Sequence, residues 1–253
     1  MCYDAETATR KALNYAKHRN DDEGAIDRLT KQLQLLDLFS QPLYHVSGFA
    51  HPKLIVFTNK EPMIPRAFEW GLIPSWAKDR SIAKQTLNAR GETIFEKPSF
   101  KTSANNKRCL IYLDAFYEHH HQDGKTYPFR ISMKDDSPLC IAGLWEEWID
   151  KETGEVVPTC TIVTTVGNSK MAAIHNNPKA EGPRMPVILL KERQDEWLSN
   201  SGEEYLKTLL QPFDENLLRY QTVGRLKGKD QLGNVQEVEN DVIYPELTRC
   251  LQS

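Results

Sequence analysis

The chain of 253 residues is 40% hydrophobic, which is enough for one sizeable core, and we expect a single domain over residues 1–253. Its 32 Lys and Arg residues are matched by 35 Asp and Glu residues, so the formal net charge is -3 and the isoelectric point is about 6.2. This balance excludes the strongly basic class of nucleic-acid-binding proteins, and any contact with nucleic acid must come from a local basic face.

Two helices are predicted near the start of the chain, at about residues 6–19 and 24–39. In the second helix the apolar residues recur near helical spacing, at Ile26, Leu29, Leu33, Leu36 and Leu38. We expect both helices to be scaffold elements that pack against a sheet.

From residue 43 onward, short apolar or alternating runs bounded by Pro and Gly are typical of strands. The runs are "LYHVSGFA", "KLIVFT", "RAFEWGLI", "RCLIYLDAFYEH", "YPFRISM", "LCIAGLWEEW", "TCTIVTTV" and "RMPVILL". Helices return at about residues 168–174, 191–199 and 202–210. The predicted fold is therefore α+β, with a mixed, mainly antiparallel sheet or open barrel at its core and flanking helices.

Two connections carry clear turn or loop signals. Residues 122–125 contain Asp-Gly between strand-like runs, which predicts a tight hairpin and puts Glu118 on or just after a strand that leads into it. The segment "HNNPKAEGPRMP" has three prolines and begins with His175, so it is predicted to be a loop. Because loops on a rigid sheet often display reactive groups, His175 gains weight as a functional residue.

Charge and cysteine patterns set further limits. Basic residues gather in two stretches, and solvated charge is the ordinary interpretation of either one alone. They are Lys97, Lys101, Lys107 and Arg108, and Arg219, Arg225, Lys227 and Lys229. The five cysteines lack a C-x-x-C pair and histidines at metal-ligand spacing, so we expect no disulfide framework, metal site or cofactor.

No apolar run approaches the length of a membrane span, and charged residues interrupt the first dozen positions where a signal peptide would be apolar. We therefore expect a soluble cytoplasmic protein that has no membrane partner. A monomer is the simplest prediction for its assembly.

Cys2 is the most informative position for chemistry. Removal of Met1, which is usual when the next residue is small, would leave Cys2 with a free α-amine and a thiol on adjacent carbons. The usual pKa values of both groups leave a useful nucleophilic fraction near neutrality. An aldehyde can form an imine with this amine, and the thiol can then close a five-membered thiazolidine. The dipeptide alone, however, favours an ordinary residue near a terminus.

Three further residues fit such chemistry, although each has a structural alternative. Glu118 lies among Leu, Ala, Phe and Tyr residues that would raise its pKa toward the range of proton transfer, but strand alternation alone would point it outward. His175 titrates near neutrality in isolation, and a lone histidine is more often a capping or surface residue. Asn88 can orient a thiol or phosphate through its amide, but an isolated asparagine usually forms a turn.

Residues 119–121 are three consecutive histidines, which invite a metal hypothesis. Consecutive strand residues point to opposite faces, so the three side chains cannot all reach one ion. We expect a solvated end of a hairpin.

Taken together, "WGLIPSWAKD", "NARGETIFEKPSFK", "RCLIYLDAFYEH" and "IHN" followed by "RMPVIL" resemble the ordered motifs of the SOS-response-associated peptidase (SRAP) family, the abasic-site processing proteins. The resemblance implies a mixed sheet with a positively charged cleft for single-stranded DNA and a reactive N-terminus at its floor. It also implies that Cys2 forms a thiazolidine with the ring-opened sugar of an abasic site.

Position by position, the resemblance assigns further roles. Asn88 would position Cys2, Glu118 would act as acid or base near its amine, and His175 would assist sugar ring opening and proton transfer. Arg90 would hold a DNA phosphate. Pro74 and Trp76 would lie near the DNA and stack on or wedge beside bases.

The chain also departs from the family pattern. Tyr3 and Asp4 stand where many members have Gly-Arg, so a basic residue near the reactive amine is missing. "YHVSGFAHP" replaces Y-N-x-A-P, which removes a proline next to the site, and His119 replaces an aromatic residue. The segment "NNPKAEGP" after His175 is longer than usual.

Two other classes of function stay open on the residues alone. In an N-terminal-nucleophile amidohydrolase, Cys2 would attack an amide with its own α-amine as base, giving turnover and no lasting bond to DNA. In a binding module without chemistry, replacing Cys2 by Ala would leave binding unchanged.

Overall fold

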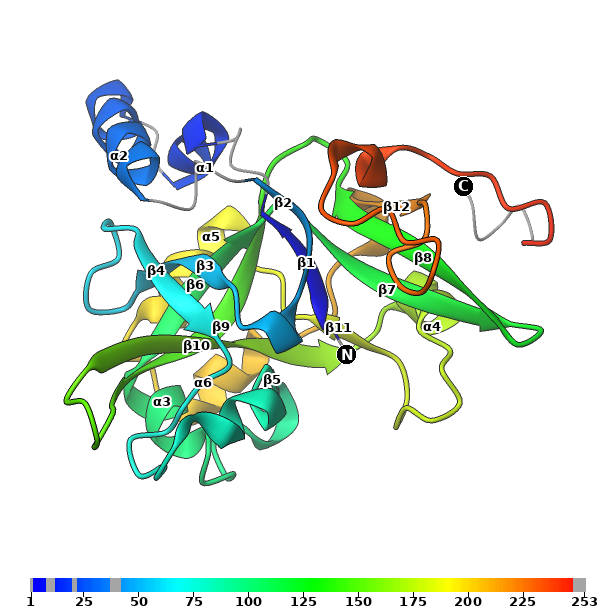
Figure 1. Cartoon of the computed structure of the whole chain (residues 1–253). Helices are drawn as coiled ribbons and strands as arrows, with labels where there is room; N and C mark the ends of the chain where they lie inside the picture. The colour runs from blue at the N-terminus through cyan, green and yellow to red at the C-terminus, as the bar shows by residue number, and fades with distance from the viewer. Residues whose placement is uncertain (1, 8–11, 20–21, 37–41, 248–253) are drawn as a thin grey trace.

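The computed structural model of the chain describes residues 2–7, 12–19, 22–36 and 42–247 (Figure 1). Its centre is a barrel in which each strand pairs with the next, and β10 closes the ring by pairing with both β9 and β4. In ring order the strands are β4 (Arg66–Trp70), β3 (Lys53–Thr58), β6 (Arg108–Leu113), β9 (Leu139–Ile149) and β10 (Val156–Val166). Within this ring only the β10–β4 pairing is parallel. The predicted α+β fold is confirmed, with a closed barrel in place of an open one.

A second, antiparallel sheet lies beside the barrel (Figure 1). Its order is β12 (Leu218–Thr222), β8 (Lys125–Met133), β7 (Ala115–Gln122), β1 (Asp4–Thr7) and β2 (Leu43–Ser47). One buried apolar cluster joins the two layers, because it includes barrel residues such as Phe68 and Ile162, sheet residues such as Phe116 and Phe129, and Cys2. Cys2 is therefore part of the core.

Strand β1 corrects the prediction of a helix from residue 6. It pairs antiparallel with β2 and β7 at the same time, so its polar residues are buried. Glu6 is fully buried and accepts two hydrogen bonds from the Arg130 guanidinium, at 2.6 and 2.9 Å, and one from the Tyr117 hydroxyl at 3.1 Å. These tertiary partners compensate the cost of burying a carboxylate, and local sequence does not reveal them.

The helices cover the outside of the barrel. α1 (Ala12–Arg19) and α2 (Glu23–Leu35) contribute Tyr15, Leu29 and Leu33 to a second apolar cluster with Phe57 and Tyr112 of the barrel. The predicted helix at 24–39 thus ends at Leu35, and residues 37–41 lie outside the described part of the chain. The predicted helices at 168–174, 191–199 and 202–210 are confirmed as α4 (Ser169–Ile174), α5 (Lys191–Leu198) and α6 (Glu203–Thr208).

The run "RCLIYLDAFYEH" forms two strands, not the one strand expected. The chain leaves the barrel at the end of β6 and enters the second sheet as β7, and Asp114 between them donates its backbone N–H to the Glu6 carbonyl at 2.9 Å. The Asp-Gly hairpin is confirmed: Gln122 pairs with Lys125, and Asp123 and Gly124 have φ of 51° and 73°.

Short elements gather at the C-terminal end of β10. β5 (Asn88–Arg90) runs parallel to residues 162–164 of β10, and β11 (Arg184–Pro186) runs antiparallel to residues 164–166. Neither β5 nor α3 (Lys101–Asn106) is predicted by the sequence pattern, because three- and six-residue elements carry little periodicity. Figure 1 shows that the N-terminal end of β1 reaches this same end of β10.

Candidate active site

A cavity of about 480 Å³ opens where the N-terminal end of β1, strand β7 and the loop after α4 meet. Three residues predicted from the sequence line it, namely Arg90, Glu118 and His175. The other lining residues are Tyr3, Asp4, Tyr117, His119, His121, Thr126, Asn177, Lys179, Ala180, Glu181, Gly182, Arg184 and Lys227. Asp4 pairs with Tyr117 across the sheet, so the residues just before β1 run beside Glu118.

Cys2 has no exposed surface and, like Asn88, is not among the residues that line the cavity, although its chain neighbour Tyr3 is. Asn88 donates its side-chain N–H to the Cys2 carbonyl oxygen at 2.8 Å, which ties β5 to the start of the chain. The Cys2 thiol lies 3.7 Å from the Asp4 carbonyl oxygen and donates to it. The predicted proximity of Asn88 and Cys2 is thus present in the structure.

The thiol of Cys2 differs from the expectation of an unperturbed nucleophile. Burial, followed by the charge of Glu118, raises its pKa well above the usual value. At neutral pH the sulfur therefore keeps its proton, and a reaction at sulfur requires a nearby group that accepts this proton.

Glu118 of β7 is 5% exposed and faces the cavity. Burial raises the pKa of its carboxyl group to about 7, as the apolar neighbours in the sequence predict. A carboxyl group with this pKa is present in both protonation states at neutral pH, which suits proton transfer in either direction.

His175 follows α4 directly and is 6% exposed. Its Nδ1 lies 3.0 Å from the backbone N–H of Arg184 and 3.3 Å from the carbonyl oxygen of the same residue. Because an N–H can only donate, the shorter contact favours a lone pair on Nδ1 and the hydrogen on Nε2. Burial lowers the pKa of His175 to about 4, so the imidazole is neutral at pH 7, which corrects the expectation of titration near neutrality.

Arg90, at the end of β5, lines the cavity but already has an anionic partner. Its guanidinium lies 2.6 Å from the carboxylate of Glu181, whose side chain is 76% exposed. Glu181 belongs to the segment "NNPKAEGP" after His175, so a carboxylate of that segment pairs with the arginine expected to hold a phosphate.

Trp76 and Pro74 lie outside the set of cavity residues. Trp76 is 55% exposed and donates its indole N–H to the Pro98 carbonyl oxygen at 3.3 Å, whereas Pro74 is buried. An exposed indole in a fixed orientation is compatible with stacking on a base, and its role stays a prediction.

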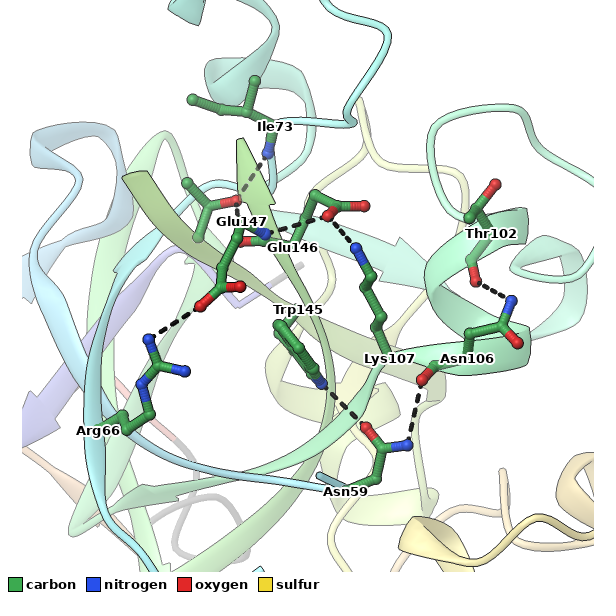
Figure 2. Close-up of polar contacts among 10 residues, drawn as sticks. Asn59, Arg66, Ile73, Thr102, Asn106, Lys107, Trp145, Glu146 and Glu147 are labelled. Atoms are coloured by element: carbon green, nitrogen blue, oxygen red, sulfur yellow. Dashed lines mark hydrogen bonds and ion pairs between the residues drawn. The ribbon is translucent and has the colours of Figure 1, made fainter. Parts of the chain in front are cut away.

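The first basic stretch is not a nucleic-acid face at its C-terminal end. Figure 2 shows Lys107 directed at Glu146, next to Trp145 of β9. Arg108 is 1% exposed and donates to backbone carbonyls of Ala104, Asn105 and Trp197 at 2.7 to 2.8 Å. Both cations are used inside the fold.

Sequence reasoning missed several residues of the site. The three histidines are not a solvated end: His120 is buried, its ring nitrogen lies 2.9 Å from the Ala173 carbonyl oxygen, and His119 and His121 line the cavity. Lys227, from the second basic stretch, also lines it. Asp4, noted only as a departure, is buried at the edge of the cavity.

Among the described residues, no three His, Cys, Asp or Glu side chains are placed so that they could hold a metal ion. In the same part of the chain, no helix combines the length and apolar character needed to cross a membrane.

Comparison with known proteins identifies close relatives. The family model described as "SOS response associated peptidase (SRAP)" matches residues 10–229, a range that begins after Cys2. The "Abasic site processing protein YoqW" of Bacillus subtilis (strain 168) is 42% identical over 220 residues, which are 85% of this chain and 95% of that protein. The "Abasic site processing protein YoaM" of the same organism is 36% identical over 225 residues, again 85% and 95% of the two chains.

A solved structure shows the same fold. The crystal structure of a protein from Bacteroides thetaiotaomicron is 31% identical in sequence and superposes with a TM-score of 0.78 over 96% of this chain and 100% of its own. The arrangement of barrel, second sheet and flanking helices is therefore shared with this solved protein.

Proposed function

This chain belongs to the SOS response associated peptidase (SRAP) family, and from that premise we propose that it processes abasic sites in single-stranded DNA by forming a covalent thiazolidine at Cys2. The arrangement around Cys2 carries the proposal. Asn88 donates a hydrogen bond to the Cys2 carbonyl oxygen, and Glu118, whose pKa is about 7, lies next to Cys2 and lines a cavity of about 480 Å³. The names of the relatives in Bacillus subtilis support the substrate.

The proposed reaction begins with the aldehyde form of the abasic sugar. The α-amine of Cys2, free once Met1 is removed, adds to the aldehyde carbon, and one amine proton moves to the oxygen to give a carbinolamine. The protonated Glu118 carboxyl donates its proton to the hydroxyl, which leaves as water, and an iminium forms. The iminium now faces a carboxylate.

Ring closure then uses the same carboxyl group in the opposite direction. The Glu118 carboxylate takes the thiol proton, and the sulfur adds to the iminium carbon to give the thiazolidine and regenerate the acid. The balance is one aminothiol plus one aldehyde to one thiazolidine plus water. This order accommodates a thiol whose pKa is raised by burial and by Glu118, because the proton acceptor appears only after water leaves.

We assign supporting roles to two further residues. The neutral His175, with its hydrogen on Nε2, would donate a hydrogen bond to the sugar ring oxygen as the ring opens. Asn88 would fix the Cys2 backbone so that amine and thiol keep one orientation toward the cavity. We further propose action as a monomer in the DNA-damage response, close to the genome.

The experiment is an intact-mass measurement of the purified protein before and after incubation with single-stranded DNA that contains an abasic site. We expect loss of Met1 and then a protein–DNA adduct lighter by one water than the sum of its parts. Matched controls are DNA without the lesion and protein that retains Met1.

Absence of an adduct from protein with a confirmed Cys2 N-terminus would overturn the proposal. Turnover of an amide or peptide without any lasting adduct would instead support the N-terminal-nucleophile amidohydrolase.

A further inference from the structure

Lys227 brings a positive charge to the cavity from the far end of the sequence. Its side chain is 57% exposed, lines the cavity, and places Nζ 2.7 Å from Oδ2 of Asp4. Asp4 lies only two positions from Cys2, so the ammonium group is held close to the reactive residue although 223 positions separate the two paired residues.

The carboxylate that holds Lys227 is itself fixed. Asp4 is 2% exposed, its backbone lies in β1 between β2 and β7, and its Oδ1 accepts a hydrogen bond from His45 Nε2 at 3.1 Å. Burial alone would raise the pKa of Asp4, but the hydrogen bonds with His45 and Lys227 lower it below its usual value. Asp4 is therefore ionised and anchors Lys227 in one place.

The two arginines that line the cavity are engaged differently. Arg184 is 8% exposed, and its guanidinium donates two hydrogen bonds to Glu92 at 2.7 and 2.8 Å. Arg90 is bound to Glu181. Lys227 uses one of its three ammonium hydrogens on Asp4, and more than half of the side chain faces solvent, so donors remain for an anion in the cavity mouth.

We propose that Lys227 is a phosphate-binding residue for the single strand that enters the cavity, and that Asp4 holds it beside Cys2. The ligand is a backbone phosphate next to the lesion, because an exposed ammonium group binds a negative charge and fixes its position but does not distinguish one base from another. This inference rests on the proposed function and names a contact for the same substrate.

The test is a pair of lysine variants in the same segment. Lys227→Ala removes the proposed contact, whereas Lys229→Ala, two positions on, removes an exposed lysine that is absent from the set of cavity residues. Binding is measured by titration with a single strand that carries a non-reactive abasic analogue, at several salt concentrations. Cross-linking at saturating abasic DNA is measured in parallel.

We expect Lys227→Ala to weaken binding by roughly three- to tenfold at low salt and to reduce the slope of log affinity against log salt by about 0.7, the value for one phosphate contact on a single strand. Lys229→Ala should change neither quantity and should cross-link at the wild-type rate when DNA is saturating. Lys227→Arg should restore most of the affinity.

An unchanged salt slope in Lys227→Ala, with a lower melting temperature, would overturn the inference and leave a purely structural ion pair. Because the analogue cannot react, this result is separate from a failure of cross-linking. Wild-type protein that binds the analogue but forms no adduct would instead count against the proposed chemistry alone.

Discussion

The site divides into two regions with opposite physical character. The reactive floor, defined as Cys2, Asn88, Glu118 and His175, is largely buried, and burial favours the neutral forms of its thiol, carboxyl and imidazole groups. The charged rim, defined as Arg90, Glu181, Asp4 and Lys227, consists of two ion pairs in which one partner of each is well exposed.

From this difference we expect bond formation to depend on the floor and DNA binding to depend on the rim. In the floor, low solvent access moves pKa values and makes proton transfer between neighbouring groups effective, and added salt has little influence there. In the rim, each cation is paired with a carboxylate, so binding of a polyanion would rest on local contacts of Lys227 and Arg90 with phosphates, and such contacts are screened by salt. Changes in the floor should therefore alter the rate of bond formation, whereas changes in the rim should alter DNA affinity and its salt dependence.

Removal of the floor nucleophile should have the largest effect. Cys2→Ala deletes the thiol and leaves the amine, so only a hydrolysable imine can form and no adduct should survive denaturing electrophoresis. Cys160→Ala is the matched control, because it removes another fully buried thiol, in β10, outside the cavity. A stable adduct from Cys2→Ala would show that a different residue bonds to the sugar.

The second-largest effect is expected when the exchangeable carboxyl proton of Glu118 is removed by substitution. Glu118→Gln keeps the shape but cannot exchange a proton, and we expect cross-linking to slow by roughly 10²- to 10⁴-fold. Because the pKa of Glu118 is about 7 and the acid form starts the reaction, the ratio of wild-type to variant rate should be largest below pH 7 and fall above it. A ratio that rises through pH 7 would instead indicate a base that acts first.

The same substitution has a signature in stability. The pKa of Glu118 rises on folding from its usual 4.5 to about 7, so its contribution is fully present below pH 4.5 and is lost as pH rises through 7. The difference corresponds to about 3 kcal/mol in the free energy of unfolding. Denaturant titration at pH 5 and pH 8 should show wild type losing stability relative to Glu118→Gln. Parallel curves would mean that Glu118 has an ordinary pKa.

A smaller effect is expected for the residue that orients Cys2. Asn88→Ala removes the hydrogen bond to the Cys2 carbonyl, worth about 1 kcal/mol, so the cross-linking rate at saturating DNA should fall by roughly fivefold. Asn105→Ala, in α3, removes only a hydrogen bond to Lys101 in its own helix and serves as control. Slower binding with an unchanged rate at saturation would place Asn88 among the DNA contacts.

The floor could be predicted from the sequence more fully than the rim. The apolar neighbours of Glu118 predict its raised pKa, and a single short motif provides Asn88. The buried state of Cys2 could not be predicted, because it depends on strand β1. In the sequence the polar residues of β1 resemble the start of a helix, and only the folded structure shows that Arg130 and Tyr117 pair with Glu6. The pairing of Asp4 with Lys227 and of Arg90 with Glu181 joins residues distant in sequence, and no local pattern encodes it.

The rim offers the smallest and most discriminating prediction. The Glu181 carboxylate is paired with the Arg90 guanidinium. A DNA phosphate must therefore displace this carboxylate before it binds Arg90. Glu181→Ala should therefore strengthen binding of single-stranded DNA by about two- to fivefold at low salt, and the gain should disappear as salt screens both charges. Glu155→Ala, which removes one exposed carboxylate beside Arg80 outside the cavity, is the matched control for net charge. Equal gains in both variants would reflect net charge alone, whereas a gain confined to Glu181→Ala, with an unchanged cross-linking rate at saturating DNA, would show that the segment after His175 competes with the substrate for Arg90.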